Sequence, residues 1–518
     1  MRYLSLICMI LLFSGLQAQN LNLEVKGKQL FNEELSDVWG YADEDGNEYA
    51  LVGRNFGLGI YDVTDPDNIS QTFVVPGPYS TWRDLKTWGD YLYVTCESGP
   101  GLLIVDMSGL PDNTNLPYTY FNGDTMTFQS AHNLFIDENG FAYIFGANYS
   151  MGGAIILDLN DDPMDPEPVG IYDLNYYHDG VVRGDTLWGS AVYTGDAQVV
   201  DVSDKANPEL LSSWKTPGVF THNMWFSDDN NFVFSTDEIY NGTIAAYDVS
   251  DIYNPTLVDE WKVNDTNIIP LNTHYINGYL VTSYYTKGLN IIDVSRPHNM
   301  IETGRYDTSP LYNYEGFHGN WGVYPWLPSG NILATDIETG LYVFEPTYVR
   351  GCFLEGAVTD QHTGDIIFFP TINVIEDTLI VDGDILGEYA TATMNAGTYT
   401  VEVSAEGYFS KTISGVVLVN GELTELDVEL SNWPADVEEK VKEEGVALYP
   451  NPASTIFSVK TTDIIESIEL ISIDGKLIQP KVNYLSSKAV DVSNLSSGVY
   501  TLKVSIEGRE ITRMVSIL

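Results

Sequence analysis

The sequence predicts an all-β protein, in which a seven-bladed β-propeller is followed by two small β-sandwich domains. Two repeating features of the chain lead to this fold. The first is a short apolar run that ends in an acidic residue and recurs every 43 to 52 residues. Periods in this range are typical of propellers and solenoids. The run occurs seven times, ending at Asp62, Asp106, Asp158, Asp201, Asp248, Asp293 and Glu345.

The second feature is the layout inside each unit, which separates a propeller from a solenoid. Residues 84–107 contain an extended run, a turn at Gly89-Asp90, an alternating run, a Gly-rich turn and then the acidic-ended run. Phrases rich in Asp, Asn and Pro follow, as in residues 201–208, and a fourth extended run comes after them. Four short strands per unit, without helical periodicity, are the pattern of a propeller blade. We therefore expect seven blades within residues 21–348.

The N-terminus has the composition of an export signal. A charged start, Met1-Arg2, precedes an apolar run too short to span a bilayer, and Ala18 is a suitable cleavage residue. This predicts a signal peptide over residues 1–18; the alternative is a buried N-terminal strand. No later segment is apolar enough to be a transmembrane segment. Cys96 and Cys352 remain after cleavage, and we expect both to be buried free thiols.

The net charge of the chain limits the classes of partner that it is expected to bind. The 73 acidic residues outnumber the 24 lysines and arginines, for a net charge of −49. Such a field repels phosphate backbones and anionic lipids, so nucleic acid and direct membrane adsorption are excluded as expected partners. It suits a protein kept soluble in salty surroundings, or one that binds divalent cations. The excess lies before residue 446, since the last 73 residues carry equal numbers of acidic and basic side chains.

Residues 350–431 change in character and predict a separate β-sandwich, with alternating runs between Asp/Gly turns. Four short segments of this region match a known module: Gly356–Asp360, Thr363-Gly364, Ala396–Tyr399 and Glu406–Tyr408. Through these segments the region resembles the carboxypeptidase regulatory-like (transthyretin-like) module. The resemblance implies a spacer or docking role without catalysis.

Residues 432–445 are polar and densely charged, which predicts a linker. Residues 446–518 then predict a second small sandwich. Its motifs are Tyr449-Pro450-Asn451-Pro452, Asp474-Gly475-Lys476 and a final segment that contains Gly498 and Tyr500. These motifs, in this order, resemble the C-terminal sorting domain of the type IX secretion system. That resemblance implies Sec export, contact with the type IX secretion machinery, and a location outside the cell or on the outer-membrane surface.

Candidate site residues lie at the start of each blade's first run, which forms the innermost strand and lines the axial channel. Most blades carry a His or Arg followed by Asn or Asp there; blade one carries Ser36-Asp37, and blade six carries Leu271-Asn272 with His274 offset. We expect the pairs to ring one mouth of the channel. The candidate ligand-binding residues are Arg83, Asp84, His132, Asn133, His178, Asp179, His222, Asn223, His274 and His318.

Two interpretations of this ring remain open. Imidazoles and carboxylates could hold a transition metal or act as general acid and base. Alternatively, a repeated residue meets a repeated structural need, such as a hydrogen bond to the neighbouring blade's backbone. No nucleophile elbow, zinc-protease motif or phosphate loop is present, so no catalytic residue is assigned.

Calcium is the one cofactor that the acidic turns suggest. Asp43, Asp45 and Asn47 are candidate ligands in the loop Asp43–Glu48. The Asp-rich turns that follow the repeated runs, such as Asp62–Asp67, lack the full twelve-residue calcium pattern and are better explained as ordinary turn formers.

The propeller as a whole resembles the LVIVD-repeat proteins and, more closely, the choice-of-anchor B family. The matching segments are Arg83–Trp88, Ala154–Pro163, Val200–Pro208, Tyr306–Pro310 and Trp321–Pro325. The resemblance implies fold and location but no activity. The leading hypothesis is a secreted or surface-attached binding or scaffold protein whose propeller recognises an extracellular protein or glycan. The alternative is an extracellular hydrolase or lyase, metal-assisted and directed at polysaccharide, acting at the channel mouth.

Overall fold

The computed structural model describes residues 20–263, 267–310, 316–432, 445–461, 464–473, 475–478, 480–483, 488–506 and 509–518. The predicted signal peptide and most of the predicted linker lie outside these residues. The chain divides into two compact units, Met1–Gly351 and Cys352–Leu518. Within the described residues, no helix is both long enough and apolar enough to cross a membrane.

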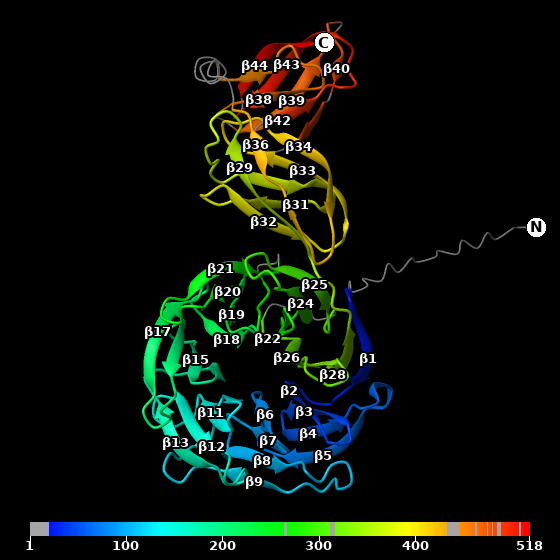
Figure 1. The fold of residues 1–518 in the computed structure, drawn as a ribbon. Coiled ribbons are helices and arrows are strands. Elements are labelled where there is room, and N and C mark those ends of the chain that lie inside the picture. The colour runs from blue at the N-terminus through cyan, green and yellow to red at the C-terminus, as the bar shows by residue number, and fades with distance from the viewer. Residues whose placement is uncertain are drawn as a thin grey trace, which may run out of the picture. The chain divides into compact units, whose positions relative to one another are not determined.

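The first unit is a ring of seven four-stranded antiparallel sheets, numbered here 1 to 7 (Figure 1). Sheet 1 consists of β2 (Leu35–Ala42), β3 (Glu48–Arg54), β4 (Gly57–Asp62) and β5 (Ser70–Pro76). Sheet 2 consists of β6 (Leu85–Trp88), β7 (Tyr91–Val94), β8 (Leu102–Asp106) and β9 (Tyr118–Phe121). Sheet 3 consists of β10 (Asn133–Ile136), β11 (Phe141–Phe145), β12 (Ala154–Asp158) and β13 (Glu167–Tyr172). A 3-10 turn, η1 (Pro66–Asn68), lies between β4 and β5.

The remaining sheets of the ring follow in chain order. Sheet 4 consists of β14 (Asp179–Arg183), β15 (Thr186–Ala191), β16 (Asp196–Asp201) and β17 (Glu209–Lys215). Sheet 5 consists of β18 (Thr221–Phe226), β19 (Phe232–Asp237), β20 (Ile244–Asp248) and β21 (Thr256–Trp261). Sheet 6 consists of β22 (Thr273–Ile276), β23 (Tyr279–Ser283), β24 (Leu289–Asp293) and β25 (Ile301–Tyr306). Sheet 7 combines β26 (Asn320–Tyr324), β27 (Ile332–Asp336) and β28 (Gly340–Pro346) with β1 (Leu23–Gln29).

The first strand of each sheet from sheet 1 to sheet 7 (β2, β6, β10, β14, β18, β22 and β26) contacts its counterpart in the next sheet, and β26 returns to β2. This closed circle of inner strands makes the unit a β-propeller, as the sequence predicts. Hydrophobic side chains fill the seven spaces between neighbouring sheets. Leu51 and Ile60 of sheet 1, for example, share a core with Leu92 and Val105 of sheet 2. Each sheet therefore buries both faces, which explains strands that are almost continuously apolar.

The ring is closed by the N-terminal strand. β1 pairs antiparallel with β28, with Leu23 opposite Pro346, so the last sheet takes its outer strand from the beginning of the chain. Lys26 adds an ion pair with Glu345, at 3.0 Å. Pairing across more than 300 residues converts an open row of sheets into a ring without an unpaired seam between first and last sheet.

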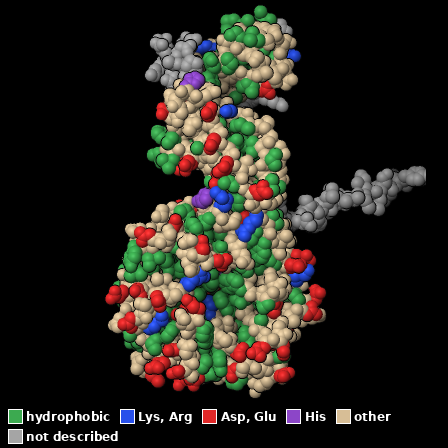
Figure 2. Space-filling view, in the orientation of Figure 1, with side chains coloured by type: hydrophobic (Ala, Val, Ile, Leu, Met, Phe, Trp, Pro, Cys, Tyr) green, Lys and Arg blue, Asp and Glu red, His purple; other side chains and the backbone are tan. Residues whose placement is uncertain are grey.

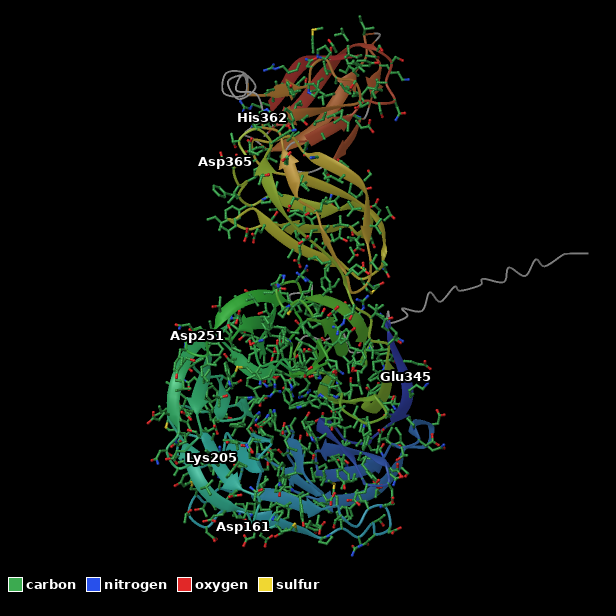
Figure 3. The ribbon with its side chains drawn as sticks, in the orientation of Figure 1. Asp161, Lys205, Asp251, Glu345, His362 and Asp365 are labelled. Carbon is green, nitrogen blue, oxygen red and sulfur yellow. The ribbon has the colours of Figure 1, made fainter. Side chains whose placement is uncertain are left out.

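The repeated acidic residue has a local structural role. In sheets 1 to 6 it ends the third strand, and its carboxylate accepts a hydrogen bond from the backbone N–H two residues later. At Asp248 this bond, from Ser250, measures 2.9 Å. Such a turn reverses the chain toward the fourth strand, which is the ordinary turn role that the sequence favours. Asp161, Lys205 and Asp251 of these turns lie at the outer edge of the ring (Figure 3). Acidic side chains also gather along this rim (Figure 2).

The second unit contains two sandwiches, each made of two four-stranded sheets around its own apolar core. The first consists of β29 (Cys352–Asp360), β32 (Glu388–Thr393), β35 (Leu423–Glu425) and β36 (Val428–Leu430), against β30 (Thr371–Val374), β31 (Leu379–Asp382), β33 (Gly397–Ser404) and β34 (Lys411–Leu418). A 3-10 turn, η2 (Ile375–Asp377), follows β30.

The second sandwich is built from residues 445–518. Its sheets are β37 (Ala447–Tyr449), β38 (Ile456–Lys460), β41 (Lys481–Asn483) and β42 (Lys488–Asp491), and β39 (Ile465–Ile471), β40 (Leu477–Ile478), β43 (Gly498–Ile506) and β44 (Arg509–Ile517). The motif residue Asn451 donates to the carbonyl of Met514 and accepts from the N–H of Ser516, each at 2.9 Å. Tyr500 donates to the carbonyl of Ser496. These motif residues therefore hold the module together.

The two cysteines Cys96 and Cys352 are both buried and unpaired, as expected from their spacing. The domain boundaries predicted at 348, 350, 431 and 446 stay predictions; the change of unit at Gly351/Cys352 lies beside the second of them.

Candidate functional site at the channel mouth

One mouth of the propeller channel opens into a cavity of about 450 Å³, called here the mouth pocket. It mixes aromatic rings with carboxylates and imidazoles, the composition of a ligand site with a few convergent polar groups. The side chains come from loops and inner-strand starts of several sheets. Its lining residues are Glu34, Thr81, Trp82, Glu97, His132, Tyr176, His178, Tyr193, Glu238, Tyr285, Phe317, His318, Trp321, Ile337 and Glu338.

Two histidines of the pocket are each held by a glutamate. The Nδ1 atom of His132 lies 2.6 Å from Oε1 of Glu97, and Nδ1 of His318 lies 2.6 Å from Oε1 of Glu338. A carboxylate bound to one ring nitrogen fixes the orientation of the imidazole and leaves its Nε2 atom for another partner.

Three imidazoles form a row from the pocket into the adjoining channel entrance. The ring centroids of His132 and His178 are 3.8 Å apart, and those of His178 and His222 are 4.6 Å apart. Burial lowers the pKa of His178 well below 6.5, and the neighbouring His132 and His222 lower it further. His178 is therefore a neutral ring with a free lone pair at ordinary external pH.

A third glutamate approaches this row. Oε2 of Glu238 lies 3.5 Å from Nε2 of His222, while Oε1 accepts a 2.7 Å hydrogen bond from the hydroxyl of Tyr285. The Nδ1 atoms of His178 and His222 are buried and have no hydrogen-bond partner in the described part of the chain. The site thus combines carboxylate and imidazole donors with unsatisfied ring nitrogens.

Below the mouth pocket the channel is lined by buried charges and amides. Lys86 Nζ lies 2.6 Å from Oδ1 of Asp84. Asp179 accepts a 2.8 Å bond from the amide of Asn223, whose oxygen accepts from the N–H of Thr273 in the next sheet. These last contacts tie neighbouring sheets together, which is the structural interpretation of the repeated pair.

Further along the channel lies an aromatic cluster. His274 packs against Trp39, Trp225 and Trp326, with the rings of the two latter stacked 5.0 Å apart. Burial, with a smaller contribution from Lys86, lowers the pKa of His274 to about 3. His274 is a neutral core histidine at this level of the channel.

The sequence-predicted residues therefore separate by depth. The structure brings His132, His178 and His318 into the mouth pocket, and the adjoining channel entrance adds Arg83, Asp84, Asn133 and His222. Asp179, Asn223 and His274 lie deeper, beside Asp84 and Asn133. The Arg83 guanidinium donates hydrogen bonds to four backbone carbonyls, those of Arg54, Asn55, Pro78 and Ser80. Arg83 thus braces sheets 1 and 2 against each other.

Sequence reasoning missed the four glutamates of the pocket. Three of them, Glu97, Glu238 and Glu338, follow the second strand of their sheet, in the segments VTCE, STDE and TDIE, whereas Glu34 precedes β2. Their shared position in the repeat was a usable signal. The pocket tyrosines Tyr176, Tyr193 and Tyr285 carry no such pattern.

The candidate calcium ligands lie apart from this site, in the turn between β2 and β3. The carboxylate of Asp43 accepts bonds from the backbone and side chain of Asn47 and from Tyr49. These bonds lower the pKa of Asp43 despite the opposing effect of partial burial. The calcium assignment stays a prediction. Among the described residues, one group of three or more His, Cys, Asp or Glu side chains is close enough to hold a metal: His178, His222 and Glu238.

Comparison with known proteins supports the fold and the destination. Residues 447–517 match the secretion system C-terminal sorting domain, and residues 82–112, 191–216 and 278–308 match the LVIVD repeat. This is a β-propeller protein with LVIVD repeats and a type IX sorting domain. It is secreted by the type IX system to the cell surface or the extracellular space.

Structural and sequence neighbours add little to this. The chain is similar to the crystal structure of the β-propeller domain of Cps50 (Swd1) from Myceliophteria thermophila, at 12% identity and a TM-score of 0.44, over 62% of this chain and 99% of that one. No curated protein matches the chain in sequence. The resemblances to the choice-of-anchor B family and to the carboxypeptidase regulatory-like module stay predictions.

Proposed function

We propose that this protein is a secreted or surface-attached binding protein, and that its seven-bladed propeller recognises a glycan in the mouth pocket. The observation that carries the proposal is the pocket itself: about 450 Å³, with Trp82, Tyr176, Tyr193, Phe317 and Trp321 facing one space. Aromatic faces offer apolar contact area, and carboxylate and imidazole atoms offer acceptors for hydroxyl groups.

The charge of the pocket indicates which kind of oligosaccharide it would bind. Four glutamates, Glu34, Glu97, Glu238 and Glu338, line it, and no lysine or arginine is among its lining residues. The pocket should therefore prefer a neutral or cationic oligosaccharide to a sulfated or uronic-acid chain. The sandwich at residues 350–431 would serve as a spacer between the propeller and the sorting domain.

A glycan array tests this proposal, using the mature chain from residue 19 onward. The double variant Trp82→Ala/Trp321→Ala should bind neutral oligosaccharides about tenfold or more weakly, since each aromatic contact contributes about 0.5–1.5 kcal/mol. Tyr253→Ala is the control, because Tyr253 is an exposed aromatic residue outside the pocket. Absence of glycan binding, or binding that the double variant leaves intact, would refute the proposal; binding of a peptide instead would make the partner a protein.

A hydrolase or lyase acting at the same mouth is the second candidate. The observation that favours it is the pairing of His132 with Glu97 and of His318 with Glu338, which suits general acid–base chemistry. The two functions differ in turnover. Release of reducing ends from an array-positive polysaccharide, abolished by His132→Gln, would establish the enzyme; binding without release supports recognition alone.

A further inference from the structure

Two histidines and a glutamate converge at the floor of the mouth pocket from three separate segments. His178 immediately precedes β14, His222 lies in β18, and Glu238 follows β19. One possible ligand atom from each residue lies within 4.8 Å of the others. Two imidazoles with one carboxylate are a ligand set that binds zinc and other divalent first-row metals.

A second, independent observation points to a missing partner. The Nδ1 atoms of both His178 and His222 are buried and unpartnered, and His222 is only 5% exposed. Buried polar atoms are nearly always hydrogen-bonded, because leaving one unsatisfied costs about 1–3 kcal/mol. These two unsatisfied nitrogens belong to neighbouring rings, and the other ring nitrogen of His222, Nε2, lies 3.5 Å from Oε2 of Glu238. The folded chain therefore leaves imidazole and carboxylate donor capacity for a ligand that it does not itself contain.

From these observations we propose that His178, His222 and Glu238 bind one divalent transition-metal ion, with His132 as an additional donor. The contacts around the group fit this assignment. Tyr285 holds Oε1 of Glu238 and leaves Oε2 directed at His222. Glu97 holds Nδ1 of His132, whose ring lies against that of His178. Outer contacts of this kind orient metal ligands in proteins.

Metal binding requires the ligand atoms to move closer together. Zinc–nitrogen distances are about 2.0–2.1 Å, so two ligand atoms on one tetrahedral zinc ion are about 3.4 Å apart. Ligand atoms that lie within 4.8 Å of one another must therefore approach by up to about 1.4 Å, through rotation of the side chains.

Three or four protein ligands at the floor of an open pocket leave a coordination position facing the cavity. Such open positions are typical of sites at which a metal contacts a bound molecule. This deepens the proposed function, on which it rests for the identity of that molecule: a sugar hydroxyl could complete the coordination. Metal binding itself does not depend on the glycan.

Cobalt provides the direct test. The mature chain is stripped with a chelator and titrated with Co²⁺, followed by visible absorption, and with Zn²⁺ by calorimetry. We expect one ion per chain. Glu238→Gln, which keeps the shape of the side chain, should weaken binding at least 100-fold, and His222→Gln similarly. Tyr285→Phe should weaken it about tenfold or more, as loss of an outer contact does.

His318→Gln is the matched control, because His318 lines the same pocket and pairs with a glutamate but does not belong to the group. It should leave the Co²⁺ spectrum and affinity unchanged. A circular dichroism melt of each apo variant separates lost binding from lost folding. No stoichiometric binding by the wild type, or binding that Glu238→Gln leaves within twofold, overturns the site.

The glycan array, run on apo and Co²⁺-loaded protein, separates the two proposals. Metal binding without any glycan binding keeps the metal site and refutes glycan recognition. Glycan binding that is equal in both forms, together with an absence of specific metal binding, keeps the recognition proposal and refutes the metal site.

Discussion

Replacing Lys86 with methionine tests how the channel tolerates its buried charges. Lys86 Nζ lies 2.6 Å from Asp84 Oδ1 and 4.4 Å from the centre of the Trp39 ring. Burial alone would lower the pKa of Lys86, but the charges of Asp84 and Asp37 outweigh it and raise the pKa. The ammonium group is therefore charged and balances carboxylates that are buried in the channel.

The expected cost follows from the separation of the two charges. At an effective dielectric constant of 20, opposite charges 2.6 Å apart attract by about 6 kcal/mol. Desolvation of both ions offsets most of this, so the intact pair adds little net stability. Removing the cation alone leaves Asp84 buried and unpaired, which typically costs about 3–5 kcal/mol.

The double variant Lys86→Met/Asp84→Asn is the control, since it removes both charges and should recover more than half of the loss. Thermal and urea unfolding of the wild type, the single variant and the double variant measure the stability that the first substitution removes and the stability that the second restores. A single variant that loses less than about 1 kcal/mol, or a double variant that is no more stable than the single, would refute the reasoning.

The pH dependence of the stability lost in Lys86→Met gives a further check. Burial and the charge of Asp84 raise the pKa of Asp37 well above 3.8, and Lys86 partly offsets them. A carboxyl group whose pKa is higher in the folded state stabilises the fold fully below its unfolded value near 3.9, and this contribution disappears as pH rises through the folded pKa. Since Lys86→Met raises the pKa of Asp37 further, its deficit should be largest at pH 7 and shrink toward pH 4.

Three other predictions concern the sorting domain and the repeat. Deleting residues 446–518 should leave a folded propeller and sandwich trapped in the periplasm, as measured by cell fractionation and a thermal melt; wild-type amounts in the medium would contradict the sorting role. Gly170→Ala should lower the melting temperature of the propeller by more than Gly184→Ala, because a Cβ at Gly170 would lie 1.7 Å from the Lys205 carbonyl oxygen. A Cβ at Gly184 meets nothing within 4 Å, so alanine there costs only the backbone strain of its positive φ of 57°, about 1–2 kcal/mol. Asp248→Ala, which removes the turn acceptor, should cost about 1 kcal/mol in urea unfolding, and Asp248→Asn, which keeps an acceptor, should cost less.

The sequence by itself determined the propeller, because the features that define it are local. The acidic residue at the end of each third strand bonds to the backbone two residues later, so the turn is encoded within three positions, as at Asp248 and Ser250. Strand alternation and the 43- to 52-residue period are equally local signals. The sorting domain was also readable, since Asn451 and Tyr500 stand in short motifs whose contacts stay within that module.

The sequence located the ring of histidines but not the chemistry at its mouth. Of the five candidate histidines, His132, His178, His222 and His318 lie at or next to the mouth pocket, whereas His274 does not. His274 lies three positions beyond Leu271, which matches the other histidines in the repeat, and it packs among tryptophans. Residues two apart on a strand share a face, so His274 faces the channel like Asn272 but lies deeper in it.

Only the tertiary structure decided which side chains meet. Glu97, Glu238 and Glu338 come from sheets 2, 5 and 7 and reach one pocket because β1 pairs with β28 and closes the ring. The Arg83 guanidinium binds carbonyl groups up to 29 positions away, which no spacing in the sequence announces. Such convergence depends on the closed circle of inner strands and the direction of each loop. Those are properties of the whole ring, whereas a repeat unit encodes only its own strands and turns.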